Sequence, residues 1–124
     1  MSDLLLWLYL INSVLLINHE IDSAYWREWE LFKLPGEITG FLLLHFPLLF
    51  IVLLGLVLIV KNSFWGFILS LLLCLGGVFA FVIHTYFLEQ GRKEFDRPIS
   101  KLILLLTLLV SLIQMVVTVF KIVV

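Results

Sequence analysis

Long apolar runs constrain the fold of this chain more than any other feature of its sequence. Crossing the hydrocarbon core of a bilayer as a helix takes roughly 20 predominantly apolar residues. Four segments meet that length or come close to it, at residues 4–26, 38–60, 64–88 and 99–120. We therefore expect an all-α fold, an integral membrane four-helix bundle, with residues 1–124 forming a single four-span transmembrane domain.

The composition supports the bilayer as solvent and argues against several other classes of protein. Hydrophobic residues make up 63% of the chain and charged residues 14%, against about 45–50% and 25% in soluble domains. A domain this small leaves much of its surface exposed, and an exposed surface this apolar would be unfavourable in water. The formal net charge of −1 provides no basic field, so we expect no nucleic-acid partner. The single cysteine, Cys74, excludes an internal disulfide or a CxxC redox pair.

The short connections between the apolar runs predict an orientation in the membrane. Residues 61–63 form a tight turn, whereas residues 19–37 and 89–97 are longer and charged. Lysine and arginine in short loops mark the cytoplasmic side. One face carries six of them and the other carries two, Lys61 and Lys121. We therefore expect the first and third loops in the cytoplasm and both termini outside.

Aromatic and charged residues alternate in the first loop. Tyr25, Trp26, Trp29 and Phe32 have the composition of an interfacial belt, in which rings lie at headgroup level. We expect residues 23–33 to form a helix lying near, or emerging through, the cytoplasmic interface. The acidic residues of the two charged loops are expected to be solvated and paired with Arg27, Lys93 and Arg97; they are Glu28, Glu30, Glu89, Glu94 and Asp96.

The three histidines of the chain fall at one predicted depth. His19 is eight residues from Arg27, His45 is eight from Glu37, and His84 is five from Glu89. At about 1.5 Å of rise per residue, all three lie roughly 7–12 Å inside the cytoplasmic boundary. Ionisable groups at such a depth are costly unless they pair or face the bundle interior. The pattern predicts that three helices bring a histidine cluster together.

Polar and small residues at helical spacing indicate which helix faces point inward. Helices in membranes pack through such stripes. The stripes are Asn12, His19 and Trp26; Ser63, Ser70, Gly77, His84 and Gly91; and Thr107, Ser111, Gln114 and Thr118. The second run carries no comparable stripe around His45.

Two interpretations of the histidines remain open. In the first, His19, His45 and His84 bind a transition metal, since neutral imidazoles suit zinc, iron or copper. Asp22 lies three residues after His19 on the same helix face, so His19 with Asp22 is a candidate catalytic base and its orienter. Glu20 and Trp26 are candidates for lining a cofactor or ligand site. In the second, each histidine pairs with a carboxylate or hydroxyl and only holds helices together.

The first loop carries a resemblance to known proteins. Residues 19–26, read with Glu28, Trp29 and Glu30 and with residues 34–36, resemble a group of small bacterial multi-span membrane proteins of unassigned function. They also loosely resemble the HXXEE-type membrane domains, whose first helix ends in a histidine–acid motif. Here Asp22 replaces the expected acid and no second acid follows. The resemblance covers about the first third of the chain and implies a polar site in a bacterial inner membrane.

Three functions from different classes are compatible with these features. The first is a histidine and carboxylate site near the cytoplasmic interface, which binds a metal or small amphipathic ligand and acts on a lipid-like substrate. The second is a non-catalytic small subunit of a larger membrane complex. The third is a homo-oligomeric channel or carrier, although residues 48–60 and 64–74 provide no continuous polar path. The sequence does not decide whether the chain is an enzyme.

Overall fold

The computed structural model describes residues 2–124, and in that range the chain is helical with no strand. The helices are α1 (Ser2–Tyr25), α2 (Glu28–Leu31), α3 (Glu37–Val60), α4 (Phe64–Glu89) and α5 (Pro98–Val123). Four of them, all except the short α2, are long and apolar enough to cross a membrane. The all-α fold with four apolar helices that can span a membrane as a bundle is therefore confirmed.

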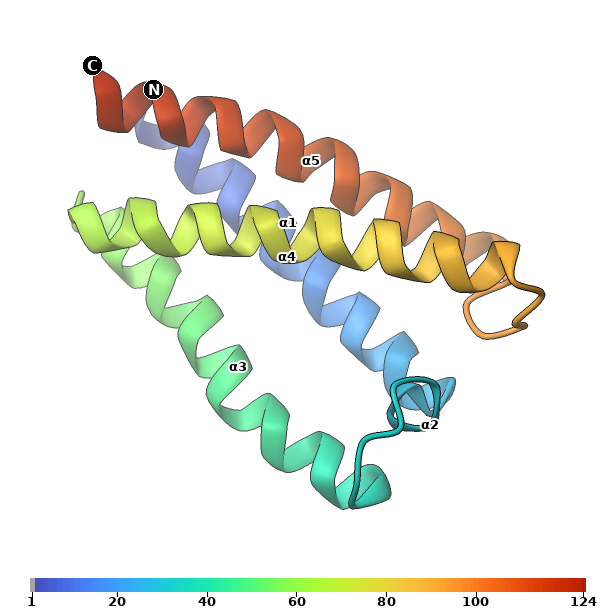
Figure 1. Cartoon of the computed structure of the whole chain (residues 1–124). Helices are drawn as coiled ribbons and strands as arrows, with labels where there is room; N and C mark the ends of the chain where they lie inside the picture. The colour runs from blue at the N-terminus through green and yellow to red at the C-terminus, as the bar shows by residue number, and fades with distance from the viewer. Residues whose placement is uncertain (1) are drawn as a thin grey trace.

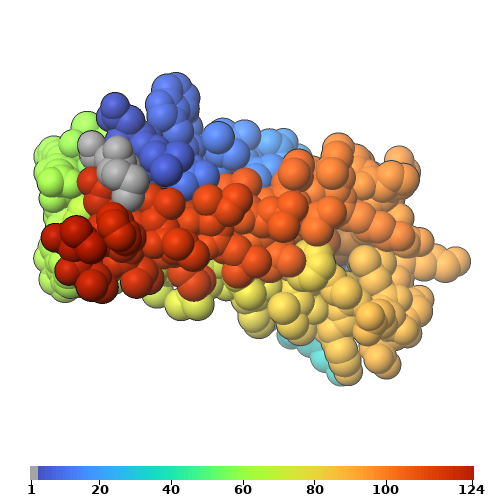
Figure 2. Space-filling model, turned by 90° about the horizontal axis from the view of Figure 1, so that it is seen from above, coloured from blue at the N-terminus to red at the C-terminus, as the bar shows by residue number. Residues whose placement is uncertain are grey.

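The long helices alternate in direction and form a four-membered bundle. α5 packs against α1 and α4, and α3 packs against α4 and α1. Both ends of the chain lie at the same end of the bundle, at the upper left of Figure 1. Seen from the α5 side, α5 runs along the bundle with the start of α1 on one side and α4 on the other (Figure 2).

The connection between α3 and α4 is tight, and the two helices diverge from it (Figure 1). Asn62 turns the chain with a φ of 54°, and the Ser63 hydroxyl caps α4 by accepting a hydrogen bond from the Trp65 amide. Gly66 is required at the contact, because a Cβ there would lie 2.7 Å from the Ile59 backbone nitrogen. The hairpin is thus held closely at one end and opens toward the other.

The chain between α1 and α3 differs from the expected single interfacial helix. α1 continues to Tyr25, and the helix breaks at Arg27, whose φ of 55° is left-handed. Only the four residues of α2 are helical after this reversal. Trp29 and Leu31 of this helix are buried, each 6% exposed. α2 packs against α3 and the end of α1, at the open end of the α3–α4 hairpin (Figure 1). The segment therefore closes that end of the bundle.

A buried polar network joins α1, α4 and α5 along the expected stripes. Asn12 Nδ2 donates to Ser111 Oγ at 3.1 Å and to Gln114 Oε1 at 2.9 Å. Gln114 Nε2 in turn donates to Ser70 Oγ at 2.8 Å, and Ser70 pairs with Thr118 at 2.8 Å. All five residues are fully buried. The network holds three of the four long helices, and α3 takes no part in it.

Candidate functional site

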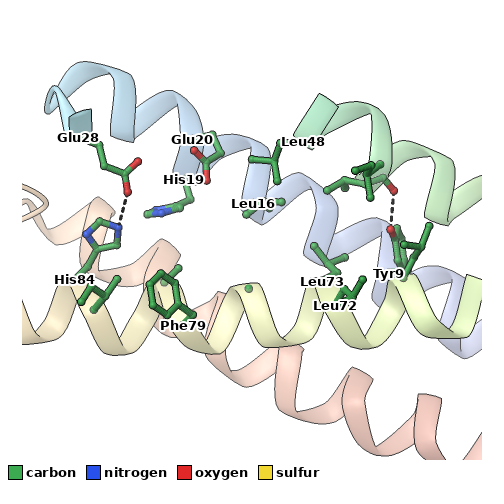
Figure 3. A pocket seen from close by; sticks show the side chains of 16 residues that line it. Tyr9, Leu16, His19, Glu20, Glu28, Leu48, Leu72, Leu73, Phe79 and His84 are labelled. Carbon is green, nitrogen blue, oxygen red and sulfur yellow. Dashed lines mark hydrogen bonds and ion pairs between the residues drawn. The ribbon is translucent and has the colours of Figure 1, made fainter. Parts of the chain in front are cut away.

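A cavity of about 360 Å³ lies between α1, α3 and α4, with one residue contributed by α2. Its polar end is formed by His19, Glu20, Glu28 and His84. Figure 3 shows these side chains gathered at one end of the cavity and Tyr9 at the other. Apolar side chains form the walls between the two ends, among them Leu16, Leu48, Leu72, Leu73 and Phe79. We call this cavity the α1–α3–α4 pocket.

Three side chains at the polar end lie close enough to share one metal ion. His19, Glu28 and His84 each offer a ligand atom, and these atoms lie within 4.8 Å of one another. His84 Nε2 is 3.2 Å from Glu28 Oε1, as the dashed line in Figure 3 marks. The His19 and His84 rings meet edge to face with centroids 4.9 Å apart. Helices α1 and α4 thus bring their imidazoles together, and α2 supplies the carboxylate.

The position of Glu28 corrects the expectation that it is a solvated charge paired with a loop cation. The helix break at Arg27 turns the start of α2 toward the bundle, and Glu28 then faces His84. Burial by itself would raise the pKa of the Glu28 carboxyl, but contact with the His84 imidazole outweighs burial and holds that pKa below its usual range. Its neighbour Glu30 does pair with Arg27, at 3.3 Å, and stays exposed.

His45 enters a separate pair beside this group. Its Nε2 lies 2.5 Å from Glu20 Oε2, and its Nδ1 lies 2.6 Å from the Phe41 carbonyl oxygen. Both ring nitrogens therefore face oxygen atoms, one from the Phe41 backbone and one from the Glu20 side chain. The Phe41 ring stacks on His45 at a centroid distance of 3.9 Å. Among the three histidines, the structure brings His19 and His84 together and ties His45 to Glu20.

Phe95 covers the two clustered imidazoles, a role that the sequence did not reveal. It is the one large apolar residue in the charged loop 89–97, and it is 1% exposed. Its ring centroid lies 4.0 Å from that of His84 and 5.4 Å from that of His19. The available signal in the sequence was a lone aromatic residue within a charged loop, because such a residue is expected to be buried against the rest of the protein.

Two other candidate residues lie away from the pocket lining. Asp22 is half-buried near the end of α1 and is absent from the lining of the α1–α3–α4 pocket. Ser23, one residue on, is fully buried and donates to the His19 carbonyl, so that face of α1 is the one turned inward. Trp26 packs against Phe95 at 6.4 Å and lines a separate surface hollow with Arg27.

His19, Glu28 and His84 are residue types that bind zinc, and their ligand atoms lie within 4.8 Å of one another. Bonds of about 2.0–2.2 Å in a tetrahedral zinc site put neighbouring ligand atoms roughly 3.3 Å apart. The Glu28–His84 separation already has that value. His19 is 3% exposed, and its Nδ1 has no hydrogen-bond partner among residues 2–124. Two imidazoles and a carboxylate would leave the fourth position of a tetrahedral site open.

Comparison with known proteins assigns the chain to a family without assigning it an activity. No curated protein and no solved structure matches the chain. A family model described as a family of unknown function (DUF6713) matches residues 5–121. The match supports the expected likeness to a family of unassigned function but gives no support to the HXXEE-type comparison. With nearly its whole length covered, the chain belongs to this DUF6713 family.

Proposed function

We propose that this chain is a membrane protein with a divalent transition-metal site, which binds a small amphipathic ligand in the α1–α3–α4 pocket. His19, Glu28 and His84 would be the metal ligands. Zinc and iron both accept this mixture of imidazole and carboxylate donors. The metal would supply Lewis acidity to an oxygen of the ligand. From the positive-inside rule, we expect this end of the bundle to face the cytoplasm.

The observation that carries the proposal is the convergence of three ligand atoms within 4.8 Å at a buried position. The three residues come from α1, α2 and α4, so this convergence is a product of the tertiary fold. A purely structural role explains the Glu28–His84 contact but leaves the buried His19 Nδ1 without a partner in the described chain. A buried polar atom without a partner costs about 1–3 kcal/mol. A metal bound at this site would provide a partner for the unpaired group, which a purely structural role does not.

The Glu20–His45 pair would serve the same pocket as a proton-accepting group. Glu20 lines the polar end alongside the three metal-ligand candidates. His45 holds the Glu20 carboxylate in place and is itself held by the Phe41 carbonyl. A molecule bound at the metal would therefore lie beside a fixed carboxylate. This division of roles differs from the one expected from the sequence, where His19 is the candidate base and Asp22 orients it.

The proposal is tested by metal titration of purified protein after chelator treatment. We expect one zinc or cobalt ion to bind per chain, with cobalt giving the visible absorption bands of a tetrahedral site. Glu28→Gln should lower metal affinity by about 10-fold or more, since a neutral amide is a poor ligand for these ions. Glu30→Gln is the matched control, because Glu30 lies two residues away on α2 and is exposed.

Two results would contradict the proposal. One is a titration in which the wild-type chain binds no metal, or binds it equally well after Glu28→Gln. The other is a metal-free chain that always purifies with a fixed membrane partner, which would favour the non-catalytic subunit function. Equal losses from Glu28→Gln and Glu30→Gln would show that general acidity, and not the buried group, attracts the metal.

A further inference from the structure

We propose that the α1–α3–α4 pocket binds a single-chain fatty acid that enters sideways from the bilayer, with its carboxylate at the metal. This inference rests on the proposed metal site and names the class of molecule that the site takes. It depends on four features of the pocket: its division into a polar and an apolar part, its size, its opening and the charge at its polar end.

The pocket has one polar end and long apolar walls, which matches the polar head and apolar chain of a fatty acid. All four of the ionisable groups at its cytoplasmic end lie together, and the side chains beyond them toward Tyr9 are apolar (Figure 3). An alkyl chain placed along these walls would move out of water or lipid and pack against leucine, isoleucine and phenylalanine side chains. Its head would lie where the ligand atoms of His19 and His84 converge. A wholly polar ligand would leave most of the pocket unfilled.

The size of the pocket suits one chain and not two. Its volume of about 360 Å³ is near the lower end of ligand pockets, which span roughly 300–1,000 Å³. Along α1, His19 and Tyr9 are ten residues apart, which corresponds to roughly 15 Å of helix. That is about half of the roughly 30 Å hydrocarbon core, the depth of one leaflet. A diacyl lipid would need space beside the pocket as well as within it.

The pocket opens toward lipid between α3 and α4. Leu48 and Ile51 on α3, with Leu72 and Phe79 on α4, line it and are still 38–61% exposed. These two helices diverge from their hairpin toward the polar end (Figure 1). On the inner side the wall is made by α1, through the buried residues Tyr9, Leu16 and His19. A chain from the surrounding leaflet can therefore enter without crossing a polar surface.

The charge at the polar end favours an anionic head. A divalent ion held by two neutral imidazoles and the Glu28 carboxylate keeps a net positive charge. The other carboxylate at this end, Glu20, makes its contact with His45. A fatty carboxylate supplies both the missing charge and an oxygen ligand for the open position. A cationic amphiphile would face an uncompensated metal.

Tyr9 forms the closed end of the pocket. Its hydroxyl donates to the Val52 carbonyl oxygen at 2.6 Å and ties α1 to α3. The side chain is fully buried. Gly55 provides the space for this contact, since a Cβ there would collide with the Tyr9 ring and hydroxyl. The length of chain that fits is therefore set by the distance between the metal ligands and this fixed ring.

Gly76 offers a substitution that fills the pocket without disturbing either end. It lines the pocket between the apolar wall and the polar end, and a Cβ added there meets nothing within 4 Å. Gly76→Phe would place a ring in the space proposed for the alkyl chain. Leu75→Phe is the matched control, since Leu75 is 56% exposed on the same helix and does not line the pocket.

The experiment uses zinc-loaded full-length protein in digitonin micelles, because that detergent has no alkyl chain to compete. Native mass spectrometry would count bound zinc and bound laurate on the same molecules. We expect one laurate per zinc-loaded chain and at least a 10-fold weaker binding in Gly76→Phe, since several buried methylenes are displaced. Zinc should remain bound in both variants, and Leu75→Phe should bind laurate as the wild type does.

The outcomes separate this inference from the proposed metal site. Zinc bound with no laurate, or laurate bound equally by Gly76→Phe, would overturn the fatty-acid assignment and leave the metal site standing. Dodecylamine binding as tightly as laurate would overturn the assignment of an anionic head. A chain that binds no zinc would overturn both proposals.

Discussion

The bundle buries two groups of polar side chains, and they differ in how their hydrogen bonds are satisfied. In the network of Asn12, Ser70, Ser111, Gln114 and Thr118, donors on one helix meet acceptors on the next. Within the described part of the chain, Asn12 Oδ1 is the one side-chain atom of this network without a partner. In the histidine group, buried nitrogens of both His19 and His84 have no partner within residues 2–124. A cavity adjoins the second group.

We propose that this difference separates polar residues that hold helices together from polar residues that bind a ligand. In lipid, hydrogen bonds between helices contribute about 0.6 kcal/mol each on average and at most about 1.7 kcal/mol. Among the described residues, the network has one unpartnered side-chain atom and none of its residues lines the pocket, so a ligand bound there would not contact it. A group that places two imidazoles and a carboxylate around a common point, at the end of a pocket, gains most from a ligand. Variants of the two groups should therefore change different measured quantities.

The largest effect is expected on metal binding when both members of the buried pair are replaced. His84→Leu combined with Glu28→Leu removes two of three proposed ligands, so metal affinity should fall by more than the roughly 100-fold upper range for an outer-shell partner. The metal-free double variant should be as stable as the metal-free wild type, or more so, because replacing both partners of a buried ion pair with apolar groups is often neutral or stabilising. Unfolding in SDS and cobalt titration give the two quantities. A large loss of stability with unchanged cobalt binding would reverse the roles of the two groups.

The opposite result is expected when the polar network is broken. Gln114→Leu removes the residue that bonds to both Asn12 and Ser70. Two lost bonds and the groups left unpaired should lower the free energy of unfolding by about 2 kcal/mol. Metal affinity should not change, since no network residue lines the pocket. Gln90→Leu is the matched control, because Gln90 is exposed after α4. A Gln114→Leu protein with normal stability and reduced metal affinity would contradict the assignment of the network to helix packing and of the histidine group to metal binding.

Periodicity in the sequence was sufficient for the polar network and for the fold. Apolar runs of membrane-spanning length predicted the helices, since helices satisfy their own backbone in lipid. The spacing of Thr107, Ser111, Gln114 and Thr118 predicted one inward face, and all four are buried. These features are local, so that each is visible within a single helix. Depth along separate helices likewise predicted that His19 and His84 would lie at one level, where their rings meet.

The residues that complete the candidate site depend on how loops fold, and the sequence did not give their positions. Glu28 reaches His84 only because the chain reverses at Arg27, an unusual left-handed position for arginine. Phe95 also has a positive φ, of 66°, at the point where its loop turns into the bundle. The sequence predicts one depth for all three histidines, yet His45 contacts the Glu20 side chain and not the other two imidazoles. The rotation of a helix about its own axis and the path of a loop leave no periodic pattern in the sequence, whereas the depth of a residue along a helix does.

A smaller effect on both the free energy of unfolding and the metal affinity is expected from replacing Phe95, which lies over the imidazoles. Phe95→Leu preserves an apolar side chain but loses the ring contacts with His84 and His19. The free energy of unfolding should fall by about 1 kcal/mol, the size of one aromatic pair. Metal affinity should fall only a few-fold, because the ligands themselves remain. Phe120→Leu, on the exposed face of α5, is the control. An unchanged metal affinity together with a large stability loss would make Phe95 a purely structural residue.

The smallest effect is expected at Tyr9, where one hydrogen bond closes the pocket. Tyr9→Phe keeps the ring and removes only the bond to the Val52 carbonyl, which already accepts within its own helix. The free energy of unfolding should fall by about 0.6 kcal/mol, the average for a bond between membrane helices, and Tyr86→Phe on the exposed face of α4 should change nothing. Tyr9→Ala is different because it also opens the closed end, so zinc-loaded protein should then bind palmitate in preference to laurate. If chain preference stays the same in Tyr9→Ala, the ring does not set the length of the bound molecule, and Tyr9 belongs with the polar network as a tie between helices.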